Sequence, residues 1–378
     1  MIPYGRQTID EDDIKAVNDV LSSDWLTTGP KVAEFEQAVA DYVGAKYAVA
    51  VCNGTAALHT AMHAIGISSG DEVIVPPMTF AATANCVVFQ GGTPVFADVD
   101  PDTLLLDPVK VEEKINEKTK AIIGVDYAGQ PCDWDSLREI ADKHVLRLVA
   151  DGCHALGAEY KGRKVGSIAD MTIFSFHPVK HITTGEGGMI TTDEPALARH
   201  MRLFINHGIS TDARQREQQS SWFYEMVGLG YNYRITDFQC ALGISQLQKL
   251  PKFLERRREI AAYYDKAFDG LFGITPLVVR KDSFHAYHLY VARVDGDTLN
   301  CDRTTLFTKL REKGIGVNVH YIPVHLHPFY MEKFHIGPGS CPIAESAYEQ
   351  IISLPMFPGI SDEDVELVAL KVKNIICS

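Results

Sequence analysis

The sequence predicts an α/β fold in which a mostly parallel β-sheet lies between helices. Short apolar or β-branched runs alternate with longer segments of helical periodicity, which is typical of α/β proteins. The short runs are apolar almost without interruption, as expected for strands that are buried on both faces. A smaller α+β unit is predicted to follow this layered unit.

The first unit is predicted from the amino end onward by its apolar runs and by the helical segments between them. Strands are predicted over residues 47–52, 72–75, 94–98, 121–127, 146–151, 171–176 and 188–192. Helices are predicted over residues 55–65, 79–89, 108–116 and 134–144. Crossover helices of this kind are what neighbouring parallel strands require.

After Ala198 the pattern becomes mainly helical, with one predicted helix over residues 236–250. Pro251 suits the first position of a second long helix that runs to about residue 268. We therefore place the boundary here, with a large domain and its N-terminal arm in residues 1–250 and a small domain in 251–378. In the small domain, strands are predicted over 288–294 and 317–321, and helices over 303–313, 343–352 and 362–376.

The composition is that of a globular protein and disfavours polyanionic partners. Of the 378 residues, 46% are hydrophobic and 22% are charged. The 36 basic and 49 acidic residues give a net charge of −13, and no basic block offsets it. Nucleic acids and anionic membranes attract proteins mainly through basic residues, so neither is an expected partner.

The cysteines and the hydropathy pattern favour the cytoplasm. The eight cysteines are spaced singly, without a C-x-x-C pair, which suits a reducing compartment. The first residues are too polar and acidic for a signal peptide. The most apolar stretch, residues 47–67, is interrupted by polar side chains, so no membrane span is expected.

Candidate functional residues follow the predicted strands, because ligands of open α/β sheets bind at the carboxyl ends of strands. Asn53-Gly54-Thr55 follows the first strand and opens a helix, whose free N–H groups could bind a phosphate. By itself this tripeptide is better explained as an ordinary turn with an N-cap. Asp151 ends the fifth strand, where it could pair with a cationic ring nitrogen or cap the next turn.

Lys180 is the third candidate. The sixth strand ends near Ser175, and an irregular loop then carries Lys180 into a glycine-rich return. Most lysines are solvent-exposed, but a lysine held in such a site can act as an imine-forming nucleophile and base. Residues 228–234 form a fourth polar loop, whose glycine spacing does not match a dinucleotide motif. A phosphate seat, an acid for a ring nitrogen and an amine for an aldehyde together indicate pyridoxal 5′-phosphate.

The same motifs carry a family resemblance that extends in order over nearly the whole chain. They are Asn53-Gly-Thr-Ala-Ala-Leu58, Asp151 with His154-Ala-Leu-Gly157, Phe174-Ser-Phe-His-Pro-Val-Lys180 with Glu186-Gly-Gly188, Tyr231-Asn-Tyr-Arg234, and His320-Tyr-x-Pro323. In this the sequence resembles the nucleotide-sugar aminotransferases of the DegT/DnrJ/EryC1/StrS family. The resemblance implies the fold-type I aminotransferase architecture, with a seven-stranded sheet, and a homodimer whose active sites lie at the subunit interface.

The resemblance also implies roles for individual residues. Lys180 would bind the cofactor covalently and shuttle protons, and Asp151 would pair with the pyridine nitrogen. His154 would lie near the ring hydroxyl and Phe80 would stack on the ring. The phosphate would be held by Gly54, Thr55 and Ser175, with Asn232 reaching the cofactor of the neighbouring subunit. Substrate contacts are expected from Arg234, His320 and Tyr321.

Within the family, the resemblance is greatest to the aminotransferases of pseudaminic acid synthesis. It rests on residues 125–129, 154–160, 177–184, 202–208 and 240–247, although His181 stands where that subgroup has proline. It implies transfer of an amino group from L-glutamate to C4 of a UDP-linked 4-keto-6-deoxy-N-acetyl-hexosamine, through pyridoxamine phosphate. The product would be UDP-4-amino-4,6-dideoxy-N-acetyl-β-L-altrosamine. Other nucleotide-linked keto sugars are the alternative substrates.

Rival functions are disfavoured by particular residues. The related sugar dehydratases have histidine in place of the lysine, so Lys180 favours a transaminase. A pyridoxal-phosphate-binding regulator remains a less favoured alternative, since no DNA-binding motif is present.

Three further groups of residues have simpler expected explanations. His320, His325 and His327 match no zinc spacing, so we expect no metal site and a surface or substrate-facing position for these histidines. Trp222, Phe223 and Tyr224 are expected to pack in the core or a dimer interface, and otherwise to stack on sugar or uracil. Cys153 is expected to be a small buried filler.

Overall fold

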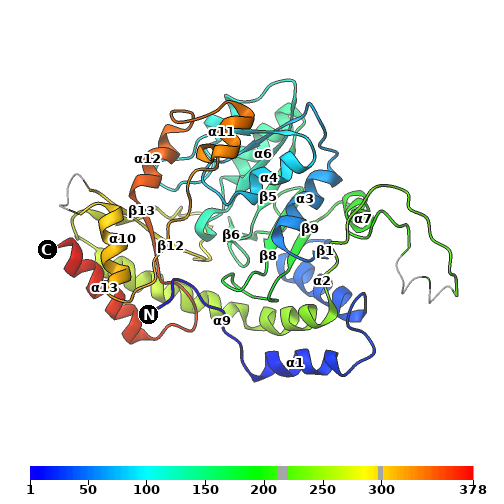
Figure 1. Cartoon of the computed structure of the whole chain (residues 1–378), viewed down its shortest axis with the longest axis horizontal. Coiled ribbons are helices and arrows are strands. Elements are labelled where there is room, and N and C mark those ends of the chain that lie inside the picture. Colours follow the sequence, from blue (N-terminus) through cyan, green and yellow to red (C-terminus); the bar gives the residue numbers. More distant parts are fainter. Residues whose placement is uncertain (212–215, 217–219, 297–300, 378) are drawn as a thin grey trace.

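The computed structural model describes residues 1–211, 216, 220–296 and 301–377 (Figure 1). A seven-stranded sheet lies at the centre, in the order β1-β9-β8-β5-β4-β2-β3. Its strands are β1 (Tyr47–Val51), β2 (Glu72–Val75), β3 (Thr93–Phe96), β4 (Thr119–Val125), β5 (Arg147–Asp151), β8 (Met171–Ser175) and β9 (Gly188–Thr192). The five strands from β3 to β8 pair in parallel, whereas β9 is antiparallel to both β8 and β1. The predicted α/β class and mostly parallel sheet are confirmed.

Both faces of the sheet are buried, and β1 shows how its sequence achieves this. Successive side chains of a strand point to opposite faces. Ala48 and Ala50 belong to the apolar cluster formed with α2 (Pro30–Val43) and α9 (Asp237–Phe268). Val49 and Val51 belong to the cluster on the other side, with α3 (Gly54–Ala64) and α4 (Ala82–Phe89). An uninterrupted apolar run is therefore what this strand needs.

The predicted helices of the first unit are present, with shifted ends. They are α3, α4, α5 (Pro108–Glu112) and α6 (Trp134–His144). The helix expected from residue 79 begins only at Ala82, because Thr79 and Phe80 belong to a turn in which the Thr83 N–H donates to the Phe80 carbonyl at 3.1 Å. In the first unit, the described residues form three further α-helices without predicted counterparts, namely α1 (Glu11–Leu21), α2 and α7 (Pro195–Phe204).

Helix α9 differs from the prediction because it does not break at Pro251. It is one helix of 32 residues with Pro251 in its interior. A proline there removes one backbone hydrogen bond, but packing along the whole helix compensates for it. Leu250 and Leu254 pack in the cluster beneath the central sheet, whereas Ile260 and Tyr264 pack in the C-terminal cluster. The division into residues 1–250 and 251–378 remains a prediction, and α9 passes between the two clusters after Leu254.

The C-terminal part is built on a small antiparallel sheet. Its strands are β10 (Ile274–Pro276), β12 (Tyr290–Val294) and β13 (Ile351–Leu354), and its helices are α10 (Arg303–Glu312), α11 (Pro328–Phe334), α12 (Pro342–Gln350) and α13 (Asp362–Ile376). A third sheet joins β11 (Ser283–Phe284), β6 (Glu159–Tyr160) and β7 (Arg163–Lys164). Short 3₁₀ helices lie at η1 (Tyr127–Gly129) and η2 (Val324–Leu326).

Two predicted features of this part are wrong. Residues 317–321 form no strand, because only Asn318 makes a bridge, to Ser353. The segment instead follows the wall of a pocket described below. The helix expected to reach residue 352 ends at Gln350, where the chain changes into β13.

Candidate active site

A pocket of about 660 Å³ opens where β1, β5 and β8 end. Its walls also come from the start of α4 and from residues 318–321 of the C-terminal part. Nine of the predicted site residues line it, namely Gly54, Thr55, Phe80, Asp151, His154, Ser175, Lys180, His320 and Tyr321. The structure thus brings together residues that are up to 267 positions apart, from Gly54 to Tyr321.

The turn after β1 is both an N-cap and part of the pocket wall. The Asn53 carboxamide oxygen accepts a hydrogen bond from the Ala56 N–H at 2.8 Å and caps α3. Glycine suits position 54, because a Cβ atom there would lie in tight contact with Cβ of Ser175, at 3.0 Å. The first turn of α3 therefore meets the Ser175 hydroxyl at the pocket wall. A helix N-terminus beside a hydroxyl suits an anion such as a phosphate.

Asp151 lies at the end of β5 and is only 5% exposed. One carboxylate oxygen accepts a hydrogen bond from the Thr83 hydroxyl at 2.7 Å. The other accepts from the Cys153 N–H at 3.2 Å. Among the residues that the structure describes, no basic side chain forms an ion pair with Asp151. A buried carboxylate held only by neutral donors can accept a cationic partner from a ligand.

Lys180 lies in the loop after β8, where its N–H donates to the His177 carbonyl at 2.9 Å. Its Nζ atom lies 3.4 Å from Nε2 of His288. Desolvation lowers the pKa of Lys180 below its usual 10.5, and the charge of Arg257 acts in the same direction. The negative charge of the nearby Asp151 carboxylate opposes this shift. A lowered pKa increases the fraction of uncharged amine, which is the form that attacks an aldehyde or accepts a proton.

A group of buried histidines surrounds this amine. Burial lowers the pKa of His154 and of His288 well below the usual 6.5, and lowers that of His320 to about 4. These rings are therefore neutral near pH 7, when they can both donate and accept hydrogen bonds. His154 Nε2 lies 3.1 Å from the Tyr321 hydroxyl, and His320 Nδ1 lies 2.8 Å from the Ser353 hydroxyl.

Phe80 presents its ring at the pocket mouth. Its side chain is 61% exposed, and its ring centroid lies 6.1 Å from that of Tyr321. An aromatic side chain exposed within a pocket can cover the face of a planar ligand.

Two predicted site residues do not line the pocket. Asn232 is exposed and pairs through its backbone with Asn206, and Arg234 donates a hydrogen bond to the Asn206 side chain at 2.8 Å. Within one chain Arg234 therefore does not line this pocket, and its predicted contact with the substrate remains a prediction. The position of Asn232 leaves its expected contact with a neighbouring subunit untested.

The pocket wall also contains residues that were not predicted as site residues, among them Thr79, Thr83, Glu186 and His288. Glu186 belongs to the glycine-rich return after Lys180, so its position in the sequence was a usable signal. His288 was placed at the start of a strand, and nothing in its neighbours indicates that it meets Lys180. The two threonines were placed inside a helix.

Other expectations concern residues outside the pocket. Trp222 is 85% exposed, and Phe223 and Tyr224 are exposed as well, so their predicted packing in the core is wrong. His325 is buried and lies 2.9 Å from Glu345, which contradicts its predicted surface or substrate-facing position. Cys153, by contrast, lines the pocket, and burial raises the pKa of its thiol, so a thiolate is disfavoured there.

Two kinds of feature are absent from the described part of the chain. No group of three or more His, Cys, Asp or Glu side chains is placed to hold a metal ion. No helix is long and apolar enough to span a bilayer.

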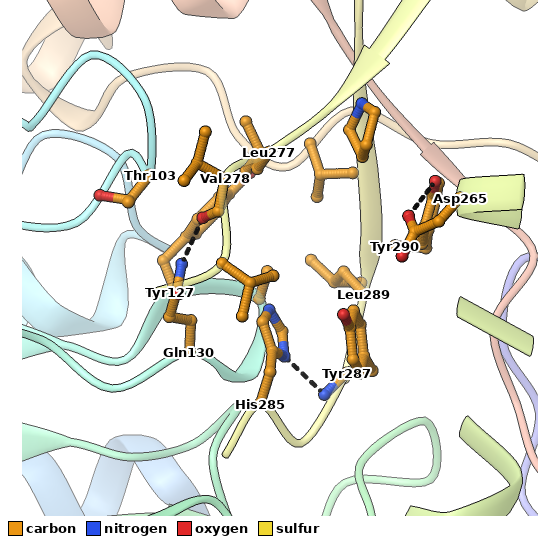
Figure 2. A pocket seen from close by; sticks show the side chains of 14 residues that line it. Thr103, Tyr127, Gln130, Asp265, Leu277, Val278, His285, Tyr287, Leu289 and Tyr290 are labelled. Carbon is orange, nitrogen blue, oxygen red and sulfur yellow. Dashed lines mark hydrogen bonds between the residues drawn. The ribbon is translucent and has the colours of Figure 1, made fainter. Parts of the chain in front are cut away.

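A second cavity, of about 260 Å³, lies on the other side of residues 285–289 (Figure 2). His285, Tyr287 and Leu289 line it, whereas His288 lines the first pocket. Some of its hydrogen-bonding groups already pair with one another, as Tyr290 does with Asp265 at 2.8 Å. None of the predicted site residues lines this cavity, so the candidate chemistry belongs to the first pocket.

The residues of the first pocket fit pyridoxal phosphate. Such a cofactor needs a lysine for its aldehyde, an acid for its ring nitrogen and a seat for its phosphate. One cavity supplies all three features. The lysine is Lys180, the acid is Asp151, and the phosphate seat lies where Gly54 contacts Ser175. The close approach of Gly54 to Ser175 is a further sign of fit, because a Cβ atom at position 54 would crowd the Ser175 side chain in this seat.

Comparisons with known proteins agree with this geometry. A model of the DegT/DnrJ/EryC1/StrS aminotransferase family matches residues 7–373. The chain is 44% identical to the spore coat polysaccharide biosynthesis protein SpsC of Bacillus subtilis, over 99% of this chain and 97% of that protein.

Solved structures are similar to this chain as well. The putative sugar aminotransferase Spr1654 of Streptococcus pneumoniae in its PMP form and PseC of Helicobacter pylori, an aminotransferase involved in pseudaminic acid biosynthesis, each have a TM-score of 0.93 and 35% identity. In both cases 99% of each chain is covered. These matches confirm the resemblance, the fold-type I architecture and the cofactor. The chain belongs to the DegT/DnrJ/EryC1/StrS aminotransferase family and is a pyridoxal-phosphate-dependent transaminase.

Proposed function

We propose that this transaminase moves an amino group from L-glutamate to C4 of a UDP-linked 4-keto-6-deoxy-N-acetyl-hexosamine. The observation that best supports the sugar-transaminase site is the presence of Lys180 and Asp151 in the walls of one pocket, beside the Gly54–Ser175 seat. The similarity to PseC supports the choice of sugar. The donor and the sugar are parts of the proposal, whereas the transaminase activity follows from the family.

In the proposed site, each side chain has one task. Bound pyridoxal phosphate supplies an electron sink for the carbanion that forms when a proton leaves the donor. Lys180 holds the cofactor covalently and, when released, moves that proton with its uncharged amine. Asp151 faces the ring nitrogen and keeps it protonated. The remaining cofactor contacts come from Gly54, Thr55 and Ser175 at the phosphate, His154 near the ring hydroxyl and Phe80 on the ring face.

The substrate side of the pocket comes from the C-terminal part. His320 and Tyr321 reach the pocket, where neutral imidazole and phenol groups can form hydrogen bonds with sugar hydroxyls.

The identity of the sugar has a competing proposal. SpsC is 44% identical to this chain, and its name places it in spore coat polysaccharide synthesis. Another nucleotide-linked keto sugar is therefore the alternative substrate. A panel of UDP- and dTDP-linked 4-keto and 3-keto sugars, assayed with pyridoxamine-loaded protein, separates the two. Selective amination of the UDP-linked 4-keto-6-deoxy-N-acetyl-hexosamine supports the proposal, and a higher kcat/KM for another sugar overturns it.

A regulator that only binds the cofactor is a further alternative. An enzyme should convert its bound cofactor to the pyridoxamine form when L-glutamate is added, with a change of absorption. A regulator should keep the starting spectrum.

We also propose a cytoplasmic location. All eight cysteines are free thiols, which is consistent with a reducing compartment.

The rate of covalent cofactor binding should depend on pH with a midpoint below that of an ordinary lysine. Only the uncharged amine attacks the aldehyde, so the rate rises as pH increases through the pKa of Lys180. Since desolvation lowers this pKa below 10.5, the rise should begin at lower pH than for a lysine model amine. Stopped-flow absorbance of cofactor-free protein mixed with pyridoxal phosphate measures this profile. A midpoint equal to that of the model amine would contradict the environment described for Lys180.

We also propose a homodimer in which Asn232 completes the cofactor site of the neighbouring subunit. Asn232 is exposed within one chain and does not line that chain's own pocket, which supports this arrangement. Asn232→Ala and Lys180→Ala should each be inactive as pure proteins. After co-expression, a mixed dimer would hold one site with both native residues, and random pairing should restore about a quarter of the wild-type activity.

The control for this complementation is a mixture of the two separately purified proteins, assayed before and after subunit exchange. Activity should appear only as mixed dimers form, which native mass spectrometry can follow. If Asn232→Ala alone keeps wild-type cofactor affinity, or if mixed dimers stay inactive, the shared site is excluded.

A further inference from the structure

Two threonine hydroxyls lie in line behind the carboxylate of Asp151. Thr83, at the start of α4, has no exposed surface, and its Oγ1 atom lies 2.7 Å from Oδ2 of Asp151. Thr79 is almost fully buried in the preceding turn, and its Oγ1 atom lies 2.7 Å from Oγ1 of Thr83. The three side chains therefore form a continuous hydrogen-bonded row at the wall of the pocket.

The direction of these hydrogen bonds follows from the chemistry of the groups. An ionised carboxylate can only accept, so the single hydroxyl proton of Thr83 is donated to Asp151. Thr83 then has only lone pairs to offer Thr79, so Thr79 must be the donor in the second bond. A hydroxyl that accepts one hydrogen bond becomes a better donor in the next. Thr79 thus strengthens the contact between Thr83 and Asp151.

The backbone holds Thr83 in place. Its N–H donates to the Phe80 carbonyl at 3.1 Å, and the Cys86 thiol contacts its carbonyl oxygen at 3.1 Å. The hydroxyl therefore approaches the carboxylate from a fixed point on α4. The Cys153 N–H occupies the other carboxylate oxygen at 3.2 Å. With one donor on each oxygen, the carboxylate plane is fixed, and the remaining lone pairs can face a ligand in the pocket.

We propose that Thr83, supported by Thr79, is a positioning residue that orients the Asp151 carboxylate toward the ring nitrogen of the cofactor. This inference rests on the proposed role of Asp151 and adds two residues to it. A fixed carboxylate forms its charge-assisted hydrogen bond without first losing rotational freedom. The gain in cofactor affinity depends on the ring nitrogen, because Thr83 acts only through the Asp151 carboxylate, which faces that nitrogen.

A ligand pair tests this specificity. The full-length protein, freed of its cofactor, is titrated with pyridoxal 5′-phosphate and with its 1-deaza analogue, in which a C–H group replaces the ring nitrogen. Wild-type protein should bind the natural cofactor more tightly than the analogue. In Thr83→Val, which removes the hydroxyl but keeps the shape, the Kd for pyridoxal phosphate should rise about tenfold. The Kd for the analogue should change by less than about twofold.

Two variants provide matched comparisons. Thr83→Ser keeps the hydroxyl and should restore the preference for the natural cofactor. Thr79→Val should reduce the preference by a smaller factor, since it removes only the supporting bond. Thermal unfolding of each protein shows whether it is folded, and Thr83→Ala replaces Thr83→Val if the valine is not tolerated.

The outcomes separate this inference from the proposed role of Asp151. Equal losses of affinity for both ligands in Thr83→Val would show a merely structural role and overturn the inference. An unchanged preference would overturn it as well. Asp151→Asn is the reference, because it should abolish the preference completely. If Asp151→Asn loses the preference and Thr83→Val keeps it, only the role of Thr83 fails. If Asp151→Asn keeps it, the proposed role of Asp151 fails.

Discussion

Lys180→Ala is expected to abolish transamination while leaving the fold intact. The side chain lies at the pocket surface rather than within an apolar cluster, so its removal should cost little stability. The reaction loses both its covalent anchor and its proton carrier, and kcat should fall by about 1,000-fold or more, as expected for loss of a catalytic acid–base group. Coupled detection of 2-oxoglutarate release from L-glutamate measures this loss.

A small primary amine added to the medium distinguishes loss of the amine from general damage. In Lys180→Ala, methylamine can occupy the space of the missing side chain and supply an uncharged base. The rate should then rise with methylamine concentration, whereas Lys180→Arg, which fills the space with a permanent cation, should not respond. If Lys180→Ala retains turnover without added amine, another residue carries the chemistry.

Asp151→Asn is expected to have the second largest effect. The amide has nearly the same shape, but it removes the negative charge that faces the ring nitrogen, so the cofactor becomes a weaker electron sink. It also removes one of the two hydrogen bonds that the carboxylate accepts, from Thr83 or from the Cys153 N–H, because the amide nitrogen cannot accept. We expect kcat to fall by about 100-fold or more, in the range found when a charged catalytic contact is lost. The affinity for pyridoxal phosphate should fall as well.

The measurement for Asp151→Asn combines single-turnover kinetics with cofactor titration. Asp98→Asn is a control, because Asp98 is also a buried acid after a strand but bonds to the backbone N–H groups of Ile343 and Ala344. The control should lose stability without the same loss in the rate of the chemical step per folded protein. Equal single-turnover rates in wild type and Asp151→Asn would remove Asp151 from the mechanism.

The sequence was sufficient to predict the central sheet because each strand is buried on both faces. Residues 121–125, for example, are too few for a typical helix and too apolar for a surface loop, so a buried strand is the best explanation of such a run. Because ligands of open α/β sheets bind at the carboxyl ends of the strands, the residues that follow these strands were expected at one edge of the sheet. They include Asp151, Ser175 and the turn at Asn53. Because carboxyl ends of parallel strands meet, this local pattern was enough to bring most of the pocket together.

Features that depend on distant contacts were not predictable in this way. Pro251 resembles a helix start in sequence, yet α9 continues through it because two separate apolar clusters hold the helix on either side. Residues 317–321 alternate like a strand, but most of the segment finds no partner strand and faces the pocket. His288 has no local mark of function, and its contact with Lys180 exists only in the folded chain.

The polar surface loops were the least predictable. Trp222 is apolar and was expected to be buried, but nothing in its neighbours specifies a covering element within the chain. Arg234 belongs to a family motif, yet the structure directs it to Asn206. The chemistry of Trp222 predicts an apolar contact and that of Arg234 predicts a hydrogen bond, but neither side chain specifies which residue provides the contact.

Lys180 is the residue that we expect to bind the cofactor covalently. Reduction of the purified protein with borohydride converts the reversible bond into a permanent one, and peptide mass spectrometry then locates the added group. We expect a single modified lysine, at position 180. We expect no modification after L-glutamate has converted the bound cofactor to its pyridoxamine form. A label on another lysine, or no label in cofactor-loaded protein, would contradict it.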